Sequence, residues 1–240
     1  MGQQDDQRTQ MLNEWVRPLV VEFIGTFVLI FAGAGAIIAT GGKDLVAIAL
    51  AHGLAIGLFV TAAGHISGGL FNPALTVGLV ATRRLTPLKG ALYIAVQLLG
   101  AIVAAALLTA VFDKGLWKPV DLGTPQVAGA LSSGQALLLE GIMTFFLMFV
   151  VFGTAIDRRN GTAIAGLAIG LTITMDIFLG GAATGAAMNP ARALGPALIG
   201  NVWGDQWVYW VAPIAGAAIA ALLYEYILLG WMKPASSPAD

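Results

Sequence analysis

The tripeptide Asn-Pro-Ala occurs twice in this chain of 240 residues, at positions 72–74 and 189–191. In each copy a run of small residues leads up to the asparagine, proline follows at once, and a short, mostly apolar run comes next. This order is typical of a helix with asparagine as its N-cap and proline as its first residue. We therefore predict two short helices, at 73–81 and 190–200. The residues of the motif are Asn72, Pro73, Ala74, Asn189, Pro190 and Ala191.

Each predicted helix is too short to cross a bilayer. At about 1.5 Å per residue it spans roughly 15 Å, about half of the roughly 30 Å hydrocarbon core. Two such half-helices can meet at the midplane, where their N-termini direct positive dipole ends at one central point. A capping asparagine uses its side-chain oxygen on the backbone, so we expect the NH2 groups of Asn72 and Asn189 to be free for a passing molecule. The motif thus predicts a pore.

The composition places the chain in a membrane. Hydrophobic residues make up 58% and charged residues 10%, against roughly 45–50% and 25% in a soluble domain. Six apolar stretches are long enough to span a bilayer, at 19–40, 45–64, 88–112, 136–156, 163–179 and 207–229. The net charge of −1 argues against a nucleic-acid partner, and the absence of cysteine excludes thiol chemistry. We expect no metal, no cofactor and no enzymatic activity.

The two halves of the chain repeat one pattern of three spans and one half-span. Glu22 and Thr26 of the first half recur, with their spacing kept, as Glu140 and Thr144. Because three is an odd number, the halves must have opposite orientations, related by a pseudo-two-fold axis in the membrane plane. The predicted fold class is an all-α membrane protein with six transmembrane helices plus two re-entrant half-helices in an inverted repeat. We expect one channel domain over 1–240, with repeats at about 15–112 and 135–232.

Basic residues orient this bundle. One side carries Arg8, Arg17, Arg83, Arg84, Lys89, Arg158, Arg159 and Lys233, and the other carries Lys43, Lys114 and Lys118. The excess predicts that both tails, 1–14 and 233–240, lie in the cytoplasm, and we expect the cell membrane as the location. Tryptophans near span ends fit interfacial anchoring, namely Trp15, Trp117, Trp203, Trp207 and Trp231.

Arg192 is the first candidate for a pore-lining charge. It lies three residues into its half-helix, where an unpaired cation costs at least ~2.5–3.5 kcal/mol and marks a pathway. His52 and Ile177 fall at the same depth by residue count, so they predict a constriction together with Arg192 and a small residue such as Ala186. The alternatives are a snorkelling arginine and a packing histidine. We expect His52 to hydrogen-bond with the solute.

Acidic residues are few inside the spans. Glu22 and Glu140 are predicted to accept N–H groups of the re-entrant loops and so brace them, with titration as the alternative. His65 precedes the first re-entrant turn and is expected to line or brace the inner vestibule. For Asp176 three roles stay open: it braces the outer loop, pairs with Arg192 or faces a neighbouring subunit.

These motifs together resemble the aquaporin family, also called the major intrinsic proteins. The resemblance rests on HISGGLFNPALT, on MNPAR, on the paired glutamates and on six spans with two half-spans. It implies a homotetramer with one pore per subunit and a constriction formed by His52, Ile177, Ala186 and Arg192. This set of four is similar to that of plant tonoplast intrinsic proteins and of the ammonia- and peroxide-permeable animal branch. Ala193, in place of aspartate after the second motif, is similar to the water-selective branch.

The predicted function is therefore a passive channel for water and small neutral solutes in the bilayer. Ammonia or hydrogen peroxide are the expected additional solutes, and protons and ions are excluded. The alternatives are a glycerol or small neutral solute facilitator, a coupled secondary transporter and a structural membrane protein. Coupled transport needs titratable or ion-chelating groups at the midplane, where only Asn72 and Asn189 are expected.

Overall fold

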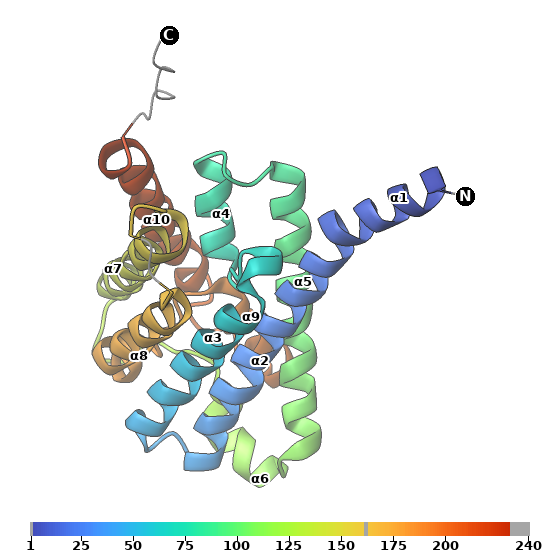
Figure 1. Cartoon of the computed structure of the whole chain (residues 1–240). Helices are drawn as coiled ribbons and strands as arrows, with labels where there is room; N and C mark the ends of the chain where they lie inside the picture. The colour runs from blue at the N-terminus through green and yellow to red at the C-terminus, as the bar shows by residue number, and fades with distance from the viewer. Residues whose placement is uncertain (1, 161–162, 231–240) are drawn as a thin grey trace.

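The computed structural model describes residues 2–160 and 163–230 (Figure 1). Six of the described helices are long and apolar enough to cross a membrane. The predicted tail 233–240, Lys233 and the predicted anchor Trp231 lie outside the described residues. In chain order the elements are α1 Gly2–Met11, η1 Leu12–Val16, α2 Arg17–Thr40, α3 Leu45–Ser67, α4 Pro73–Ala81, α5 Pro87–Val111, α6 Lys114–Trp117, η2 Lys118–Gly123, α7 Ser133–Val151, η3 Phe152–Ile156, α8 Ala165–Thr184, α9 Pro190–Gly200, α10 Val208–Leu223 and η4 Tyr224–Leu228.

The two half-helices α4 and α9 begin and end where the sequence predicts, because asparagine and proline fix their first turn. The predicted span at 163–179 is wrong at its end. Its helix, α8, continues to Thr184 and stops at Gly185, whose φ of 81° lies in the left-handed region. The glycines and alanines of 180–183 lower the hydrophobicity of this last turn, but they stay helical.

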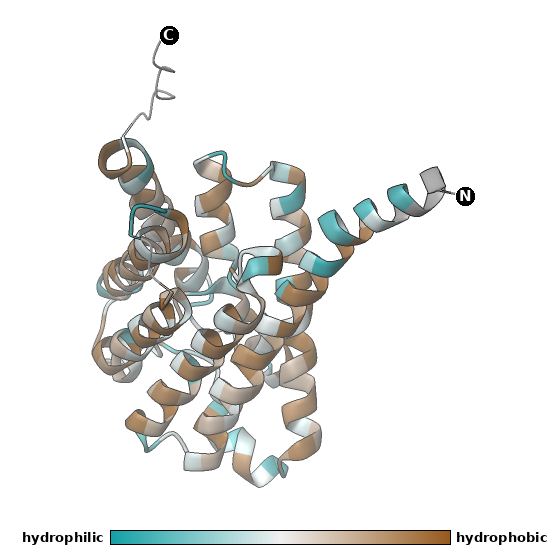
Figure 2. Ribbon diagram, viewed as in Figure 1, coloured by the Kyte–Doolittle hydropathy of each residue, from teal (hydrophilic) through white to brown (hydrophobic). Residues whose placement is uncertain are grey.

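The N-terminal residues form a helix rather than an irregular tail. α1 is followed by η1 and α2 without a break, so one helical rod runs from Gly2 to Thr40. Figure 1 shows α1 projecting away from the bundle, and Figure 2 shows that its residues are largely hydrophilic. α1 therefore lies beyond the apolar part of α2.

The packing of the helices follows the repeat. α2 packs against α5 in the first half, and α7 packs against α10 in the second. The half-helices cross over between the halves, since α4 packs against α10 and α9 packs against α5. α3 and α8 form a further large contact across the molecule. The two half-helices are thereby held between the halves, with their N-termini toward the middle.

Glycines allow the closest of these helix contacts. A Cβ atom added to Gly170 of α8 would lie 2.4 Å from the carbonyl oxygen of Gly53 in α3. A Cβ atom added to Gly216 of α10 would lie 2.1 Å from the carbonyl oxygen of Gly141 in α7. Side chains at these positions would force the helices apart, so the small residues set the helix spacing.

The outer surface of the bundle is apolar along the spans, as Figure 2 shows. Large side chains such as Leu58, Val111 and Ile227 are 63%, 63% and 72% exposed. In water such a surface would drive aggregation, whereas in a bilayer it faces lipid. This surface and the six long apolar helices make the chain a multi-pass integral membrane protein.

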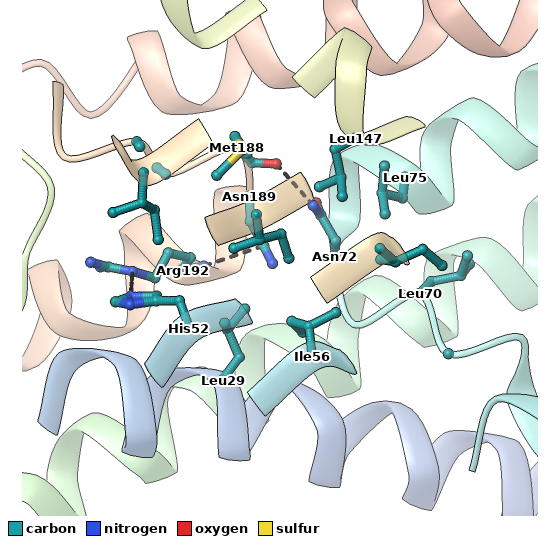
Figure 3. A pocket seen from close by; sticks show the side chains of 16 residues that line it. Leu29, His52, Ile56, Leu70, Asn72, Leu75, Leu147, Met188, Asn189 and Arg192 are labelled. Atoms are coloured by element: carbon teal, nitrogen blue, oxygen red, sulfur yellow. Dashed lines mark hydrogen bonds between the residues drawn. The ribbon is translucent and has the colours of Figure 1, made fainter. Parts of the chain in front are cut away.

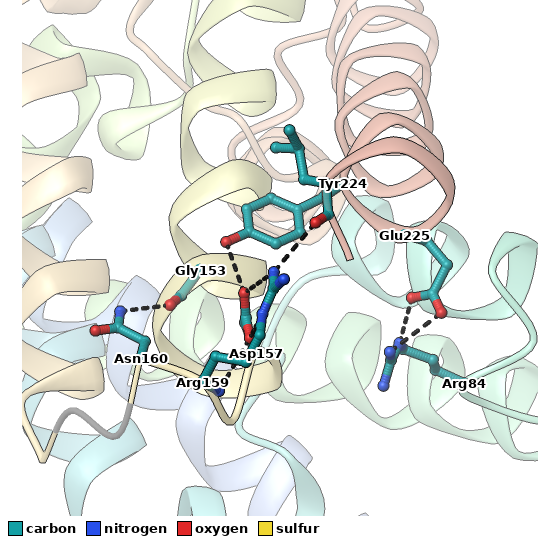
Figure 4. A network of polar contacts seen from close by, with 8 residues as sticks. Arg84, Gly153, Asp157, Arg159, Asn160, Tyr224 and Glu225 are labelled. Atoms are coloured by element: carbon teal, nitrogen blue, oxygen red, sulfur yellow. Dashed lines mark hydrogen bonds and ion pairs between the residues drawn. The ribbon is translucent and has the colours of Figure 1, made fainter. Parts of the chain in front are cut away.

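A polar network ties the connection between α7 and α8 to η4 (Figure 4). Asp157 accepts hydrogen bonds from Arg159 Nε at 2.8 Å, from Arg159 Nη2 at 2.6 Å and from the Tyr224 hydroxyl at 3.3 Å. Arg159 also donates to the carbonyl of Leu228 at 3.1 Å. The bonds to Arg159 lower the pKa of Asp157 to about 2. The carboxylate is therefore charged at neutral pH.

Candidate functional site

The two asparagines of the repeated motif cap α4 and α9. Asn72 Oδ1 accepts the N–H of Ala74 at 2.9 Å. Asn189 Oδ1 accepts the N–H groups of Ala191 at 2.9 Å and of Arg192 at 3.3 Å. Each side-chain oxygen therefore satisfies donors of the first turn that have no partner within the helix. Both asparagines are buried and line the same central cavity.

Each asparagine amide also reaches the opposite repeat, which the sequence does not predict. Asn72 Nδ2 donates to the carbonyl of Met188 at 2.8 Å, and Asn189 Nδ2 donates to the carbonyl of Phe71 at 2.9 Å. The first of these bonds is visible in Figure 3. The expectation of two free NH2 groups is therefore corrected: one N–H of each amide is taken and one remains.

The carbonyls that accept these bonds belong to strained backbone. Phe71 and Met188 have φ values of 48° and 51°, in the left-handed region that large side chains rarely adopt. Such strain costs about 1–3 kcal/mol at each residue and persists only where the surroundings fix the backbone. The crossed bonds from Asn72 and Asn189 are one part of those surroundings. They lock the two loops to each other.

Glu22 also fixes the strained backbone of the first loop. Its Oε1 accepts the hydroxyl of Ser67 at 2.7 Å and the N–H of Leu70 at 3.0 Å. Its Oε2 accepts the N–H of Phe71 at 2.7 Å and the side-chain amide of Gln97 at 2.8 Å. These four donors leave the buried carboxylate well solvated by the protein. The backbone contacts are those that the sequence analysis expects of Glu22.

Glu140 has the equivalent place in the second repeat. Its Oε1 accepts the hydroxyl of Thr184 at 2.6 Å and the N–H of Ala187 at 2.9 Å. Its Oε2 accepts the N–H of Met188 at 2.8 Å. Both glutamates are fully buried, and each fixes its loop by hydrogen bonds from backbone N–H groups inside the membrane.

Two tyrosines and one glutamine complete this bracing and were missed by the sequence analysis. The Tyr93 hydroxyl donates to the carbonyl of Ser67 at 2.9 Å, and the Tyr209 hydroxyl donates to the carbonyl of Thr184 at 2.7 Å. Tyr93 and Tyr209 occupy equivalent positions in the two repeats, and this repetition is the sequence feature that could have predicted their shared role. Gln97 gives no such signal, because nothing at the matching place in the second repeat resembles it.

His65 has a different place from these braces. It is exposed and lines a cavity together with Gly64, Gly68 and Leu70. Among the hydrogen bonds of the described residues, none joins the His65 ring to the first loop. His65 therefore lines the inner cavity, and its bracing role stays a prediction.

Arg192 is held by two acceptors. Its Nε donates to His52 Nε2 at 3.1 Å, as Figure 3 shows, and its Nη1 donates to the carbonyl of Gly123 at 2.8 Å. Both side chains are almost fully buried, with Arg192 2% and His52 3% exposed. No described residue accepts a hydrogen bond from Nη2. The cation therefore keeps donors for a molecule in the cavity.

The contact with Arg192 corrects the expected role of His52. The Nδ1 atom of His52 lies 2.8 Å from the carbonyl of Ile48, to which only an N–H can donate. The Nε2 atom then carries a lone pair, and this lone pair accepts from Arg192. Both ring nitrogens are thus in use in a neutral imidazole. His52 positions Arg192 and offers the solute no free nitrogen.

Gly123 was also missed by the sequence analysis. It follows Asp121 and Leu122, and all three have left-handed φ values of 47°, 56° and 71°. A Cβ atom on Gly123 would lie 2.9 Å from the Cβ atom of Ala34, so glycine is required for this approach to α2. Every residue has a backbone carbonyl, so the residue type at position 123 does not show that its carbonyl accepts a hydrogen bond from Arg192.

Three cavities follow one another through the middle of the chain. The central cavity has a volume of about 20 Å³ and shares His52, Ile177 and Arg192 with a wide vestibule of about 400 Å³ beside Lys43. At its other end it shares Leu70 with a vestibule of about 440 Å³ beside His65. A water molecule needs roughly 10–15 Å³ by the same measure, so the centre admits a single file.

The wall of the central cavity is apolar apart from a few groups. Ile177 joins His52 and Arg192 at the Lys43 end, and Ala186 lines the same central cavity, so the structure brings the four predicted constriction residues into one cavity wall. Both asparagines follow, and apolar residues form the remaining wall, namely Leu29, Ile56, Gly69, Leu70, Leu75, Leu147, Ile169, Ile173, Ala187 and Met188. Among the described residues there is no group of three or more acidic, histidine or cysteine side chains that could hold a metal ion.

Asp176 takes none of its three expected roles. It is fully buried within the single chain, so it does not face a neighbouring subunit. Neither of its oxygens has a hydrogen-bond partner among the described residues, so it neither braces the outer loop by such a bond nor pairs with Arg192. Its place beside the pore-lining Ile177 brings it close to the constriction without lining it.

The fold and this central passage define an integral membrane protein with a pore through the chain. The profile of the Major intrinsic protein family matches residues 9–224. The chain is 44% identical to Aquaporin TIP4-4 of Zea mays over 89% of this chain and 87% of that protein. It is 41% identical to Aquaporin-4 of Mus musculus over 86% of this chain and 65% of that protein.

A solved structure agrees with these sequences. The aquaglyceroporin from Plasmodium falciparum superposes with a TM-score of 0.81 at 27% identity, covering 90% of this chain and 97% of that chain. The chain therefore belongs to the major intrinsic protein family, the family of the aquaporins. The predicted family and the predicted fold class are confirmed.

Proposed function

We propose that the chain is a passive water channel that excludes protons and ions. The observation that carries this proposal is the narrow central cavity between two wide vestibules. At its middle, Asn72 and Asn189 each keep one N–H for a passing oxygen, and the surrounding wall is aliphatic. Water moves in single file through such a passage because few sites bind it and none holds it strongly.

Proton exclusion rests on electrostatics. α4 and α9 direct the positive ends of their dipoles at the centre, where each begins at a capping asparagine. Arg192 adds a full positive charge at the end beside the Lys43 vestibule. A hydronium ion or a metal cation meets this field without a compensating carboxylate in the cavity wall, whereas neutral water does not.

We propose that His52, Ile177, Ala186 and Arg192 set the solute selectivity. His52 uses both nitrogens on Ile48 and Arg192, so the ring presents donors from Arg192 and an apolar side at Ile177. Ammonia and hydrogen peroxide are small, neutral and hydrogen-bonding, and they fit this mixed ring. Glycerol lacks a continuous apolar wall there for its carbon backbone, because Arg192 and His52 occupy one side.

The alternatives lack support at the centre of the pore. A coupled transporter needs a titratable or ion-binding group on the pathway, and the wall of the central cavity contains no acidic residue. The buried glutamates Glu22 and Glu140 use their oxygens on the loops instead. A merely structural protein has no need of a continuous passage. Passive conduction is the function that the geometry supports best.

The wider arrangement is proposed as follows. The whole chain is one channel domain of two repeats, at about 15–112 and 135–232, with tails at 1–14 and 233–240 in the cytoplasm. Four chains form a homotetramer in which each keeps its own pore. The Lys43 vestibule then faces outward and the His65 vestibule inward, since the side of His65 carries the excess of basic residues. The proposed location is the cell membrane.

Purified protein in liposomes tests the proposed function. Stopped-flow light scattering should show water permeability well above that of empty liposomes, and ammonia entry, followed by an internal pH dye, should also be accelerated. Glycerol permeability should stay near that of empty liposomes. Rapid glycerol entry with slow water flow would support a glycerol facilitator instead.

Separate measurements test the arrangement. The mass of the detergent-solubilised protein, corrected for detergent, should equal four chains. A tag at either terminus should be accessible only from the cytoplasm of intact cells, and the tagged chain should reside in the cell membrane. Because several similar relatives are TIP-type aquaporins, residence in an internal membrane is the contrary outcome for the location alone.

A further inference from the structure

Methionine carries the sulfur that a peroxide can oxidise in this chain, because the sequence contains no cysteine. The methionines of the described residues differ in their surroundings. Met11 and Met175 are exposed on the outside of the molecule. Met143 and Met148 are fully buried. Met188 lines the central cavity, whereas the other four line none of the three cavities of the passage. A thioether therefore stands in the wall of the pore.

The backbone places Met188 at the level of the two asparagines. Met188 directly precedes Asn189, and its carbonyl accepts the amide of Asn72 at 2.8 Å. Figure 3 shows Met188 among the residues that surround the cavity. Only 2% of Met188 is exposed, so a reagent reaches its side chain through the passage. An oxidant of Met188 must therefore be small enough to enter the single-file centre.

Hydrogen peroxide meets this condition. It is small and neutral, and its permeation belongs to the proposed function, on which the present inference rests. Asn72 and Asn189 each keep one N–H at the centre of the cavity. Fixed donors of this kind stabilise the negative charge that develops on the leaving oxygen when an O–O bond breaks. The centre of the pore thus combines a thioether with donors that bind and polarise a peroxide.

We propose that Met188 is an oxidation site for hydrogen peroxide inside the pore, and that the methionine sulfoxide formed there stops the flow of water. The sulfur lone pair attacks one peroxide oxygen and forms the S–O bond, while the O–O bond breaks. The departing hydroxide takes the proton from the sulfur-bound oxygen and leaves as water. The thioether is oxidised to a sulfoxide, and one peroxide is reduced to one water molecule.

The sulfoxide changes both the space and the polarity of the centre. Its oxygen is added to a cavity of about 20 Å³, in which one water molecule needs roughly 10–15 Å³. The S=O oxygen accepts hydrogen bonds, so it competes with water for the free N–H groups of Asn72 and Asn189. A file of molecules moves only where each site releases its occupant. A fixed polar group at the centre therefore interrupts the file, and peroxide limits its own entry.

The closure is lasting in the folded protein. Methionine sulfoxide is restored by dedicated reductases, which must reach the side chain. Met188 lies within the pore and is almost fully buried, so it is out of reach of an enzyme. Dithiothreitol should not restore water flow either, because the chain has no cysteine for a thiol to reduce.

Mass spectrometry combined with water flow tests the site. Wild-type proteoliposomes are incubated with millimolar hydrogen peroxide, and samples are taken over time. Met188 should gain one oxygen, and stopped-flow water permeability should fall several-fold in step with that gain. The exposed Met11 is the positive control for the oxidant, and the buried Met148 should stay unmodified. An unmodified Met188 under conditions that oxidise Met11, or an oxidised Met188 with unchanged water flow, would overturn the proposal.

Two matched variants assign the loss of flow to one sulfur. Met188→Leu keeps a similar volume without sulfur, so its own water permeability should be the same before and after peroxide. Met148→Leu, which removes a sulfur away from the passage, should lose water flow as the wild type does. Equal losses in the two variants would contradict the assignment. Should the variant at 188 not fold, the oxidation and flow of the wild type still decide.

A larger oxidant tests the route to Met188. tert-Butyl hydroperoxide carries a bulky group that the single-file centre does not admit. It should oxidise Met11 and leave both Met188 and water flow unchanged. Oxidation of Met188 by this reagent would show that the side chain is reached from outside the passage, and the proposal would fail.

An internal peroxide-sensitive dye separates this inference from the proposed permeation. Peroxide influx together with oxidation of Met188 supports both. Influx without oxidation overturns the inference and leaves the permeation standing. Oxidation without influx supports the site and overturns the permeation, and the absence of both overturns both.

Discussion

Arg192 shows how a single residue can combine two tasks. Its Nε and Nη1 atoms are fixed by His52 and by Gly123, and the remaining donors face the cavity. The residue therefore carries a fixed charge at a known place without a carboxylate to neutralise it. At the residue scale, the exclusion of cations and of larger polar solutes depends on this charge and on the space it fills.

Replacing Arg192 by valine should open the pore to larger solutes. The substitution removes the charge and widens the ring, and a barrier lowered by about 1.4 kcal/mol raises a rate roughly tenfold. We expect urea permeability of proteoliposomes to rise by about that factor while water flow persists. Arg158→Val, which removes an exposed cation away from the pore, is the control. Equal urea permeability in the two variants would place Arg192 outside the selectivity-determining ring.

Ile177 tests the solute range. Ile177→His adds a polar group and narrows the apolar side of the ring, which Ile177 forms together with Ala186. We expect ammonia or peroxide permeability to fall several-fold relative to water, whereas Ile177→Leu, which keeps the wall apolar, should leave the ratio unchanged. Stopped-flow water and ammonia measurements on the same preparation give the ratio. An unaltered ratio in the histidine variant would contradict the proposed role of this ring.

At the scale of elements, the half-helices are the best-predicted part of the chain. Asn72 and Asn189 indicate where α4 and α9 begin, and both helices have the predicted bounds. Contacts made by backbone carbonyls gave no signal. The Gly123 carbonyl on Arg192 and the crossed bonds to Phe71 and Met188 depend on loop conformation, which is set by tertiary packing rather than by residue type.

The contact between α3 and α8 depends on its glycines. Gly170→Val places a side chain against the carbonyl of Gly53 and must push the two helices apart, a type of overpacking that costs about 1–3 kcal/mol or more. We expect a lower apparent Tm and poorer recovery of folded protein. Gly115→Ala, in α6 with no atom near the added Cβ, is the control and should behave like wild type. A tolerated valine at 170 would show that close approach is not required.

The network at the end of α7 should respond to acid. Its carboxylate, Asp157, has a pKa lowered to about 2 by Arg159, below the value of about 4 expected in the unfolded chain. The stabilisation is therefore complete above pH 4 and is lost as the pH falls toward 2. Asp157→Asn should lower the Tm at pH 7, and the difference from wild type should shrink between pH 4 and pH 2. A difference that grows with acid would contradict the assignment.

At the scale of the whole molecule, the odd number of spans in each half predicted the inverted repeat, and the family comparison agrees with it. The repeat also explains why Glu22 and Glu140, or Tyr93 and Tyr209, do the same work in each half. The equivalence fails where the halves diverge, at Gln97 of the first repeat and Pro213 of the second. Divergence between repeats, unlike the repeats themselves, can be interpreted only with the packing in view.

The central claim is that one passage conducts water and blocks protons. The most direct measurement records both in one batch of proteoliposomes that enclose a pH-sensitive dye. Under an osmotic step the vesicles should shrink far faster than empty ones, and under an imposed pH gradient with valinomycin present they should lose the gradient no faster than empty ones. Fast shrinkage accompanied by rapid collapse of the pH gradient would contradict the account.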